Sequence, residues 1–222
     1  MLFRSHRRFE ERFKVPIIET MGLTETGSQI TTNPLPPAER KIGSPGVAYG
    51  NEIMVADAEF AAVPTGQTGE ILVRGKNVMQ GYFKQPEETA KTITKDGWLR
   101  TGDLGYMDED GFIYVSGRIK ELIIKGGENI APREIDEALL EHPSILEAAA
   151  FAVPCENYGE RVEACIRFKD KSDVGIDVLM AHCVSKLGKF KSPDQIHVME
   201  DLPKGPSGKV QRLKLYGMIY AA

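Results

Sequence analysis

Short runs in which apolar and polar residues alternate fill the first half of the chain. The period of two is typical of half-buried strands, and the clearest strands are expected at residues 52–55, 69–74 and 112–115. A turn rich in Asp and Gly at residues 108–111 precedes the last of them. The pattern predicts a small, mostly antiparallel β-subdomain.

A few segments around this subdomain depart from strand periodicity. Residues 1–13 read as part of a helix without a cap before it, which suggests that the chain is truncated within an element. Residues 86–93 predict a short helix with Pro at its first position. A short strand is expected at residues 15–19, followed by a polar loop at residues 21–27.

Beyond residue 120, predicted strands alternate with amphipathic helices. Strands are expected at residues 121–125, 145–153, 162–169 and 196–199, and helices at residues 131–141, 177–187 and 212–220. Such alternation over about 100 residues is typical of a compact α+β domain, here with a roughly three-stranded sheet. The predicted fold class is α+β, with a β-rich part at residues 1–119 and a second domain at residues 120–222.

Composition and charge exclude several classes of protein. The 222 residues carry a formal net charge of −4, which gives no electrostatic reason to bind nucleic acid or an anionic membrane. No apolar run approaches the roughly 20 residues of a spanning helix, and the basic N-terminus lacks the apolar segment of a secretory signal. Cys155, Cys165 and Cys183 lack CxxC spacing, so we expect free thiols in a cytoplasmic protein.

The first candidate for chemistry is the hexapeptide MGLTET at residues 21–26. Threonine hydroxyls can donate to phosphate oxygens, and a glutamate is a hard oxygen ligand for Mg²⁺. Beside Gly22, these residue types suit a polyphosphate with its metal ion. A polar loop that caps a strand is the simpler interpretation of the hexapeptide taken alone.

Two charged residues follow glycines toward the end of the β-rich part. Asp103 follows Gly102, and a carboxylate presented in this way can accept hydrogen bonds from both vicinal hydroxyls of a ribose. Arg118 follows Gly117, and its guanidinium can reach ribose or phosphate oxygens. A turn residue and a surface ion pair are the alternative interpretations.

Lys209 ends the stretch PKGPSGK, whose two Gly and two Pro predict a shaped loop. When a carboxylate joins the α-phosphate of ATP, two anions approach each other, and an ammonium group between them offsets their repulsion. Taken alone, a solvated lysine on a loop is the simpler interpretation of this residue.

Four motifs follow one another along the chain: GLTET; GEILVRGKNVMQGYF with DGWLRTGDLGY; GRIKELIIKGGENIAPREIDEAL; and PKGPSGKVQR. In this order they resemble the adenylate-forming superfamily of acyl-CoA synthetases, adenylation domains and firefly luciferase. The resemblance runs from about Phe9 to the C-terminus, and four ordered motifs are specific where one alone is weak. SQITTNPLP and VPCENYGE are most similar to the branch of oxalate–CoA and fatty acyl–CoA ligases.

The resemblance implies a two-step ligase that uses ATP, Mg²⁺ and CoA. A carboxylic acid attacks ATP to give acyl-AMP and pyrophosphate, and the thiol of CoA then attacks the acyl-AMP. Residues 1–119 correspond to the last subdomain of a large N-terminal domain, and residues 120–222 to a mobile C-terminal domain. Lys120 is implied to be the hinge about which that domain turns between the half-reactions.

The resemblance also implies roles for individual residues. They are Met21, Gly22, Thr24, Asp103 and Arg118 for ATP or AMP, Glu25 for Mg²⁺, Lys209 for catalysis of adenylation, and Gly126, Gly127 and Glu128 for CoA. Glycines suit the wall of a tunnel for the pantetheine of CoA, because a side chain would block it.

The sequence departs from the family pattern in two respects. Met21 stands where many relatives have an aromatic residue that stacks on adenine, although methionine can also pack on a purine face. The Ser/Thr/Gly-rich phosphate loop and most of the acyl pocket are not in the chain. We therefore expect an inactive fragment, with apolar surface that favours self-association, and the sequence does not identify the acid.

Two other functions fit the same motifs. The thiol acceptor can be the phosphopantetheine of a carrier protein, which would make the parent an adenylation domain of an assembly line. The chain can also act as a folded, non-catalytic module. GGENIAP is more similar to the branch that uses free CoA, so the sequence favours an acyl-CoA ligase over these functions and over a luciferase-like oxygenase.

Overall fold

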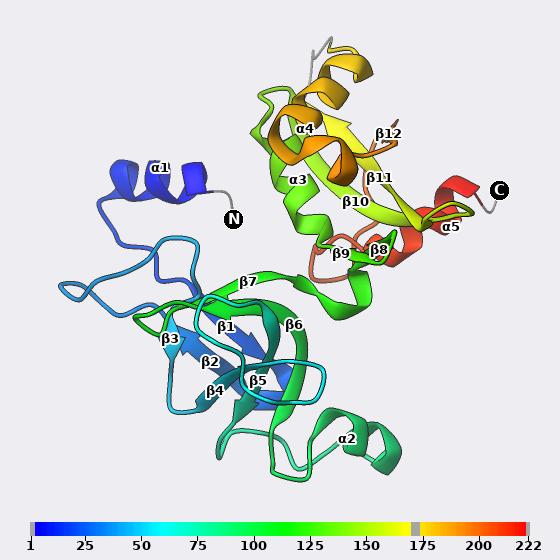
Figure 1. Ribbon diagram of the computed structural model, residues 1–222. Helices are drawn as coiled ribbons and strands as arrows, with labels where there is room; N and C mark the ends of the chain where they lie inside the picture. Colours follow the sequence, from blue (N-terminus) through cyan, green and yellow to red (C-terminus); the bar gives the residue numbers. More distant parts are fainter. Residues whose placement is uncertain (1–2, 170–173, 221–222) are drawn as a thin grey trace. The chain divides into compact units, whose positions relative to one another are not determined.

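A computed structural model describes residues 3–169 and 174–220 of the chain (Figure 1). The chain divides into two compact units, Met1–Ser116 and Gly117–Ala222. No helix within the described ranges is long and apolar enough to cross a membrane. The predicted hinge, Lys120, lies a few residues after this division.

The first unit contains two antiparallel sheets, as the alternating pattern predicts. The smaller sheet has the order β1-β2-β3 and the larger one the order β4-β5-β6-β7. The elements of the first unit are α1 Phe3–Phe13, β1 Thr20–Leu23, the 3₁₀ helix η1 Thr24–Thr26, β2 Ser28–Thr32, β3 Val47–Ala48, β4 Glu52–Ala56, β5 Gly69–Arg74, α2 Pro86–Thr92, β6 Leu99–Met107 and β7 Ile113–Arg118. The last two residues of β7 already belong to the second unit.

The core of the first unit explains the apolar residues at positions 71–73, in the middle of β5. Val55, Ile71 and Ile113 form a buried cluster, and Met21 from the smaller sheet packs against it. β5 lies between β4 and β6, and its first five residues are all buried. The expected strands at residues 52–55, 69–74 and 112–115 are confirmed, with ends that move by at most three residues.

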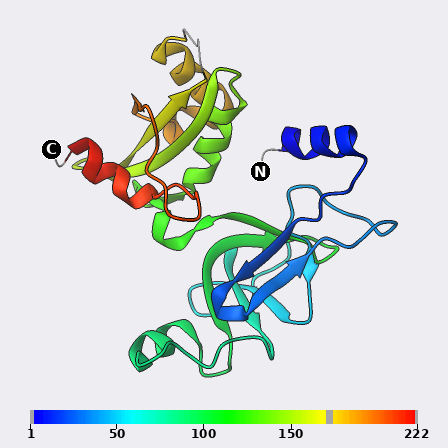
Figure 2. The same cartoon turned by 180° about the vertical axis from the view of Figure 1, so that it is seen from behind.

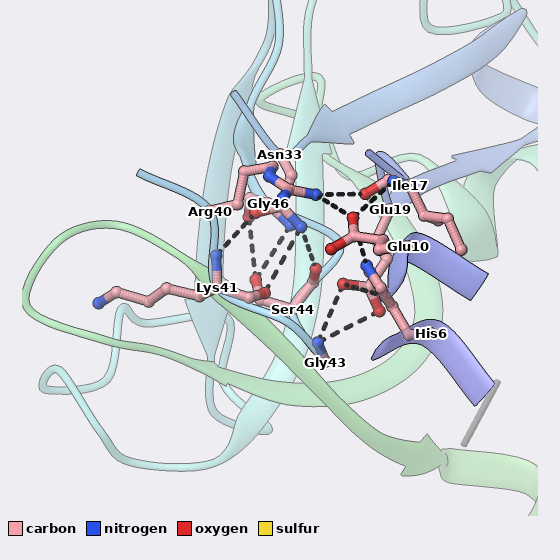
Figure 3. A network of polar contacts seen from close by, with 10 residues as sticks. All are labelled: His6, Glu10, Ile17, Glu19, Asn33, Arg40, Lys41, Gly43, Ser44 and Gly46. Atoms are coloured by element: carbon pink, nitrogen blue, oxygen red, sulfur yellow. Dashed lines mark hydrogen bonds and ion pairs between the residues drawn. The ribbon is translucent and has the colours of Figure 1, made fainter. Parts of the chain in front are cut away.

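Side chains from α1 bind the segment before β1, where the sequence predicts a strand at residues 15–19. Glu10 Oε1 accepts hydrogen bonds from the amide of Ile17 and from Arg40 Nη1, both at 2.7 Å. Arg40 Nη1 also donates to the carbonyl of Ile17 at 2.9 Å, and His6 completes the network (Figure 3). Because side chains occupy these backbone groups, the segment forms no ladder, and the expected strand is wrong.

The second unit is an α+β domain in which helices α3 and α4 pack on a five-stranded sheet. The strand order is β10-β11-β8-β9, and β12 pairs with β11 in parallel. The sheet exceeds the expected three strands because the short hairpin β8–β9 joins it. The elements are η2 Ile119–Glu121, β8 Ile123–Lys125, β9 Glu128–Ile130, α3 Pro132–Glu141, β10 Ile145–Cys155, β11 Gly159–Phe168, α4 Ile176–Lys191, β12 Gln195–Val198, η3 Arg212–Lys214 and α5 Leu215–Tyr220.

Both faces of this sheet are covered, which explains the unbroken apolar run in β10. Ala150 faces the cluster formed with α3 and α4, whereas Ala149 and Phe151 face a second cluster with Leu202 and Leu215. Figure 2 shows the segment after β12 crossing the face of the sheet opposite the two helices. The C-terminal segment that contains the predicted catalytic lysine therefore belongs to the fold of this domain.

Candidate functional site

The hexapeptide at residues 21–26 forms the end of β1 and the turn of η1, where a polar loop was expected. Residues 20–24 and 27–29 line a shallow hollow on the first unit. A Cβ at Gly22 would lie 1.9 Å from the carbonyl oxygen of Ser28, so only glycine fits between β1 and β2 here. The hydroxyl of Thr26 is buried and bonds to the carbonyl of Leu23 at 3.0 Å, which leaves Thr24 as the exposed hydroxyl of the turn.

Glu25, the predicted Mg²⁺ ligand, is oriented by a residue that the sequence reasoning did not single out. The hydroxyl of Tyr82 donates to Glu25 Oε1 at 2.9 Å, and the amide of Met79 donates to the Glu25 carbonyl at 2.7 Å. Burial, together with the bond to Glu25, raises the pKa of Tyr82, which keeps its hydroxyl a donor. Tyr82 lies in the quoted motif GKNVMQGYF, so its position in that motif was the available signal.

Asp103 lies in a bulge of β6. Between the pairs Glu70↔Leu104 and Leu72↔Arg100, one residue of β5 faces three residues of β6. The amide of Asp103 donates to Thr101 Oγ1 at 3.0 Å, and Gly102 in the middle of the bulge has φ of +71°. Asp103 itself is 6% exposed, so the bulge sets the position of this carboxylate.

Arg118 and Lys120 lie among the first residues of the second unit. Arg118 ends β7 and caps η2 in an extended conformation, and Lys120 lies in the middle of η2. Both residues are exposed. These positions leave both side chains accessible from solvent.

Gly126 and Gly127 form the turn of the β8–β9 hairpin. Lys125 pairs with Glu128, and the two glycines between them have φ of +58° and +84°. Positive φ at both central residues is characteristic of a type I′ turn, which strongly favours glycine. The turn accounts for both glycines, and it leaves Gly127 facing open space, with no atom within 4 Å of the position that a Cβ would occupy.

Lys209 lies on a loop that hydrogen bonds close at its base. The amide of Gly205 donates to the carbonyl of Lys209 at 2.9 Å, and the amide of Gln211 donates to the carbonyl of Pro203 at 2.7 Å. Lys204 and Val210 form a bridge across the loop. The side chain of Lys209 is exposed, and its ammonium has no ion-pair partner among the residues that the structure describes.

The structure thus places the predicted residues in two groups, one on each unit. Met21, Gly22 and Thr24 line the hollow at η1, with Glu25 in the same turn. Within the described ranges, no group of three acidic, His or Cys side chains could hold a metal ion by itself, so a metal at Glu25 would need ligands from elsewhere. Glu70, which the sequence reasoning did not single out, is buried, and its Oε1 accepts a hydrogen bond from the amide of Gly102 in the bulge.

Comparisons with known proteins agree with the interpretation of the motifs. The family described as AMP-binding enzyme matches residues 4–83, and the AMP-binding enzyme C-terminal domain matches residues 134–209. A sulfoacetate–CoA ligase from Cupriavidus necator is 53% identical over 210 residues, which are 95% of this chain and 41% of that protein. An oxalate–CoA ligase from Saccharomyces cerevisiae is 40% identical over 206 residues, which are 92% of this chain and 38% of that protein.

A solved structure agrees as well. ATP-bound MatB from Rhodopseudomonas palustris has a TM-score of 0.92 at 33% identity, covering 98% of this chain and 43% of that one. The chain spans about two fifths of the length of the curated relatives it matches. The ordered matches to both family models and the level of identity confirm the resemblance of the four motifs: the chain belongs to the adenylate-forming superfamily of AMP-binding enzymes.

Proposed function

We propose that this chain is part of an AMP-forming acid–CoA ligase, which activates a carboxylic acid with ATP and transfers the acyl group to CoA. The observation that carries the proposal is the loop of Lys209, which holds an exposed ammonium group on a base closed by hydrogen bonds. Adenylation brings two anions together, and a fixed positive charge stabilises the transition state between them.

In the first half-reaction, a carboxylate oxygen of the acid attacks the α-phosphorus of ATP, and pyrophosphate leaves. We assign to Lys209 the stabilisation of charge on the oxygens around that phosphorus. Thr24 donates its hydroxyl to phosphate, and Asp103 and Arg118 bind the ribose. Support comes from the exposed hydroxyl of Thr24 and from the fixed position of Asp103 in its bulge.

Glu25 is suited to hold the Mg²⁺ that accompanies ATP. One of its carboxylate oxygens, Oε1, accepts the hydrogen bond from Tyr82, while Oε2 has no partner among the described residues. A carboxylate with one oxygen anchored and the other open is a good hard ligand for Mg²⁺. The ion would supply charge neutralisation to the leaving pyrophosphate, and Tyr82 would keep the carboxylate in place.

In the second half-reaction, the thiolate of CoA attacks the acyl carbon, AMP leaves, and the thiol proton is released to solvent. We assign the wall of the CoA tunnel to Gly126, Gly127 and Glu128, and the hinge between the two states to Lys120. The open space beside Gly127 supports the first assignment.

Three free cysteines, two of them buried, suit a cytoplasmic enzyme.

We further propose that the acid carries a second acidic group. Sulfoacetate and oxalate, the substrates in the names of the two relatives, each combine the reacting carboxylate with another anion. Most of the acyl pocket is expected outside the chain, so the relatives alone support this choice. Sulfoacetate and oxalate should therefore be better substrates than acetate and palmitate in the full-length enzyme.

The test of the proposed function is the substitution Lys209→Ala in the full-length enzyme that contains this chain. Adenylation, followed as pyrophosphate release, should slow by at least about 100-fold, as expected when a group that stabilises transition-state charge is removed. Thioester formation from supplied acyl-AMP should change by less than about threefold. Lys214→Ala, which removes a nearby exposed lysine, serves as the control, and an unchanged pyrophosphate release in Lys209→Ala would contradict the assignment.

Assays of the same full-length enzyme with different acceptors identify the thiol that takes the acyl group. CoA should accept the acyl group, whereas the phosphopantetheine of a carrier protein should not. The reverse result would make the enzyme an adenylation domain of an assembly line. The 222-residue chain alone should catalyse no ATP–pyrophosphate exchange, and robust exchange would show that the chain alone is catalytic.

A further inference from the structure

The guanidinium group of Arg212 joins three segments of the second unit. Its Nη2 lies 2.6 Å from Asp136 Oδ2 on α3, and its Nε lies 3.1 Å from Glu121 Oε2 at the end of η2. Its Nη1 donates to the carbonyl of Ala150 on β10 and lies 3.2 Å from Asp136 Oδ1. The side chains of Arg212 and Asp136 are each only 13% exposed, whereas Glu121 is 30% exposed, so the cluster is largely shielded from solvent.

The cluster favours the charged form of Arg212. Burial by itself disfavours the guanidinium cation, but the carboxylates of Asp136 and Glu121 outweigh it and raise the pKa of Arg212. Burial also raises the pKa of Asp136, and the neighbouring Arg212 offsets this only in part. Asp136 is held in turn by the amide of Ala150, which donates to its Oδ1 at 2.6 Å. Removing one partner from such a cluster leaves an unpaired buried charge, which is costly. The cluster therefore fixes the relative positions of η2, α3 and β10.

Two residues of the cluster lie next to residues with proposed roles. Arg212 follows Lys209 by three positions, and the intervening Gln211 is bonded to Pro203 at the base of the loop. Glu121 directly follows Lys120 in η2. A short, hydrogen-bonded path thus connects the proposed catalytic ammonium to the segment at the proposed hinge.

We propose that Arg212 is a positioning residue for Lys209, and that the cluster of Arg212, Glu121 and Asp136 makes the Lys209 loop turn as one body with the segment after Lys120. The inference rests on the proposed function. Without the cluster, the Lys209 loop would be tied to the domain by the apolar packing of Leu202 and Leu215 on the sheet, which does not hold the segment after Lys120. A displacement of about 1 Å can cost about 100-fold in rate, so the anchor matters most for adenylation.

The test combines Arg212→Lys with Lys209→Ala in the full-length enzyme. Lysine keeps the charge of Arg212 but cannot make the forked contacts to both carboxylates. We expect Arg212→Lys to slow pyrophosphate release by about tenfold, while thioester formation from supplied acyl-AMP changes by less than about twofold. In the Lys209→Ala background, Arg212→Lys should cause no further slowing, because it acts through Lys209.

Arg161→Lys is the matched control. Arg161 Nη2 lies 2.7 Å from the buried carboxylate of Glu163 in the same unit, so the substitution weakens a comparable ion pair outside the cluster. It should leave both half-reactions within about twofold. If thermal unfolding shows that the Arg212→Lys variant is not folded, Glu121→Gln takes its place. This substitution is expected to slow adenylation by about threefold.

The outcomes separate the inference from the proposed function. Equal slowing of both half-reactions by Arg212→Lys, or slowing that multiplies with that of Lys209→Ala, would show that Arg212 only stabilises the fold and would overturn the inference. If Lys209→Ala itself leaves pyrophosphate release unchanged, the proposed function fails. If Lys209→Ala slows pyrophosphate release but Arg212→Lys does not, the inference about Arg212 is wrong and the proposed function stands.

Discussion

The carboxylate of Glu70 accepts a hydrogen bond from the backbone amide of Gly102, with 3.1 Å between Oε1 and N. Its other oxygen, Oε2, accepts from Arg100 Nε at 3.0 Å. A buried side chain of β5 thereby holds the bulge of β6 from which Asp103 projects. Glu70 thus fixes the backbone on which the proposed ribose contact depends.

Replacing Glu70 with alanine should loosen this bulge. Without the carboxylate, the amide of Gly102 loses its partner, at a cost of about 1–3 kcal/mol in the free energy of unfolding. We expect AMP to bind the full-length enzyme about tenfold more weakly by calorimetry, since about 1.4 kcal/mol corresponds to that factor. Glu52→Ala, which removes the exposed pair with Arg74 on the same sheet, should not change AMP affinity, and equal affinities of wild type and Glu70→Ala would contradict the prediction.

Lys120→Pro should separate the two half-reactions. Proline fixes φ near −65°, so a hinge at this residue would be limited to one of its two orientations. We expect one half-reaction to retain its rate within about threefold while the other falls at least about tenfold. Stopped-flow assays of pyrophosphate release and of thioester formation measure the two rates, and Lys120→Ala, which keeps the backbone free, should leave both near wild type. Equal loss of both rates in Lys120→Pro would argue against a hinge.

Gly127→Asn should impair the CoA step while the fold is kept. Asparagine tolerates positive φ better than other side chains, so the free energy of unfolding should fall by no more than about 1 kcal/mol. The added side chain enters the open space beside the turn, where CoA is proposed to pass. Thioester formation should show a raised KM for CoA with normal pyrophosphate release.

Gly111 offers a matched control for that substitution. It also lies in a turn, with φ of +81° and no atom within 4 Å of an added Cβ. Gly111→Asn should leave the KM for CoA unchanged. A similar rise in both variants would indicate a general effect of asparagine rather than a tunnel wall.

In acid, the free energy of unfolding of the first unit should depend on whether the carboxyl group of Glu10 is ionised. The hydrogen bond from Arg40 and then that from the amide of Ile17 lower the pKa of Glu10 from 4.5 to about 2. A lowered pKa means that the native state favours the carboxylate, so the stabilisation is complete above pH 4.5 and is lost as the pH falls to about 2. The free energies of unfolding of wild type and Glu10→Gln should therefore differ at pH 7 and converge near pH 2. Glu11→Gln, at an exposed neighbouring position, should match wild type throughout, and a constant difference for Glu10→Gln would contradict the assignment.

Helices and strands that have a local sequence signal, such as a run of apolar residues or a proline at a helix start, could be predicted from the sequence. β5 and α3 are examples, because an apolar run and a helix starting at Pro132 are local signals. The strand expected at residues 15–19 failed because Glu10 and Arg40 occupy its backbone groups. Hydrogen bonds between side chains and distant backbone leave no periodic trace in a sequence.

The candidate site could likewise be predicted from the sequence only in part. Motif order indicated the hexapeptide and Lys209 as candidates, and the structure adds how the backbone of each is held. Glu70 could not be found in advance, because a glutamate in an alternating strand predicts a solvent-facing position. Its partner amide at Gly102 comes from a different strand, and only the bulge register brings the two together.

The requirement for glycine at position 22 affects how such motifs can be used to search for related enzymes. The carbonyl of Ser28 lies where its side chain would be, so the glycine is required for two strands to meet, whether or not a nucleotide ever binds. A catalytically dead descendant that kept its architecture would keep this residue too. Searches that weight this glycine therefore detect ancestry. If the proposed role of Lys209 holds, surveys for working enzymes should instead score that residue, whose side chain is exposed.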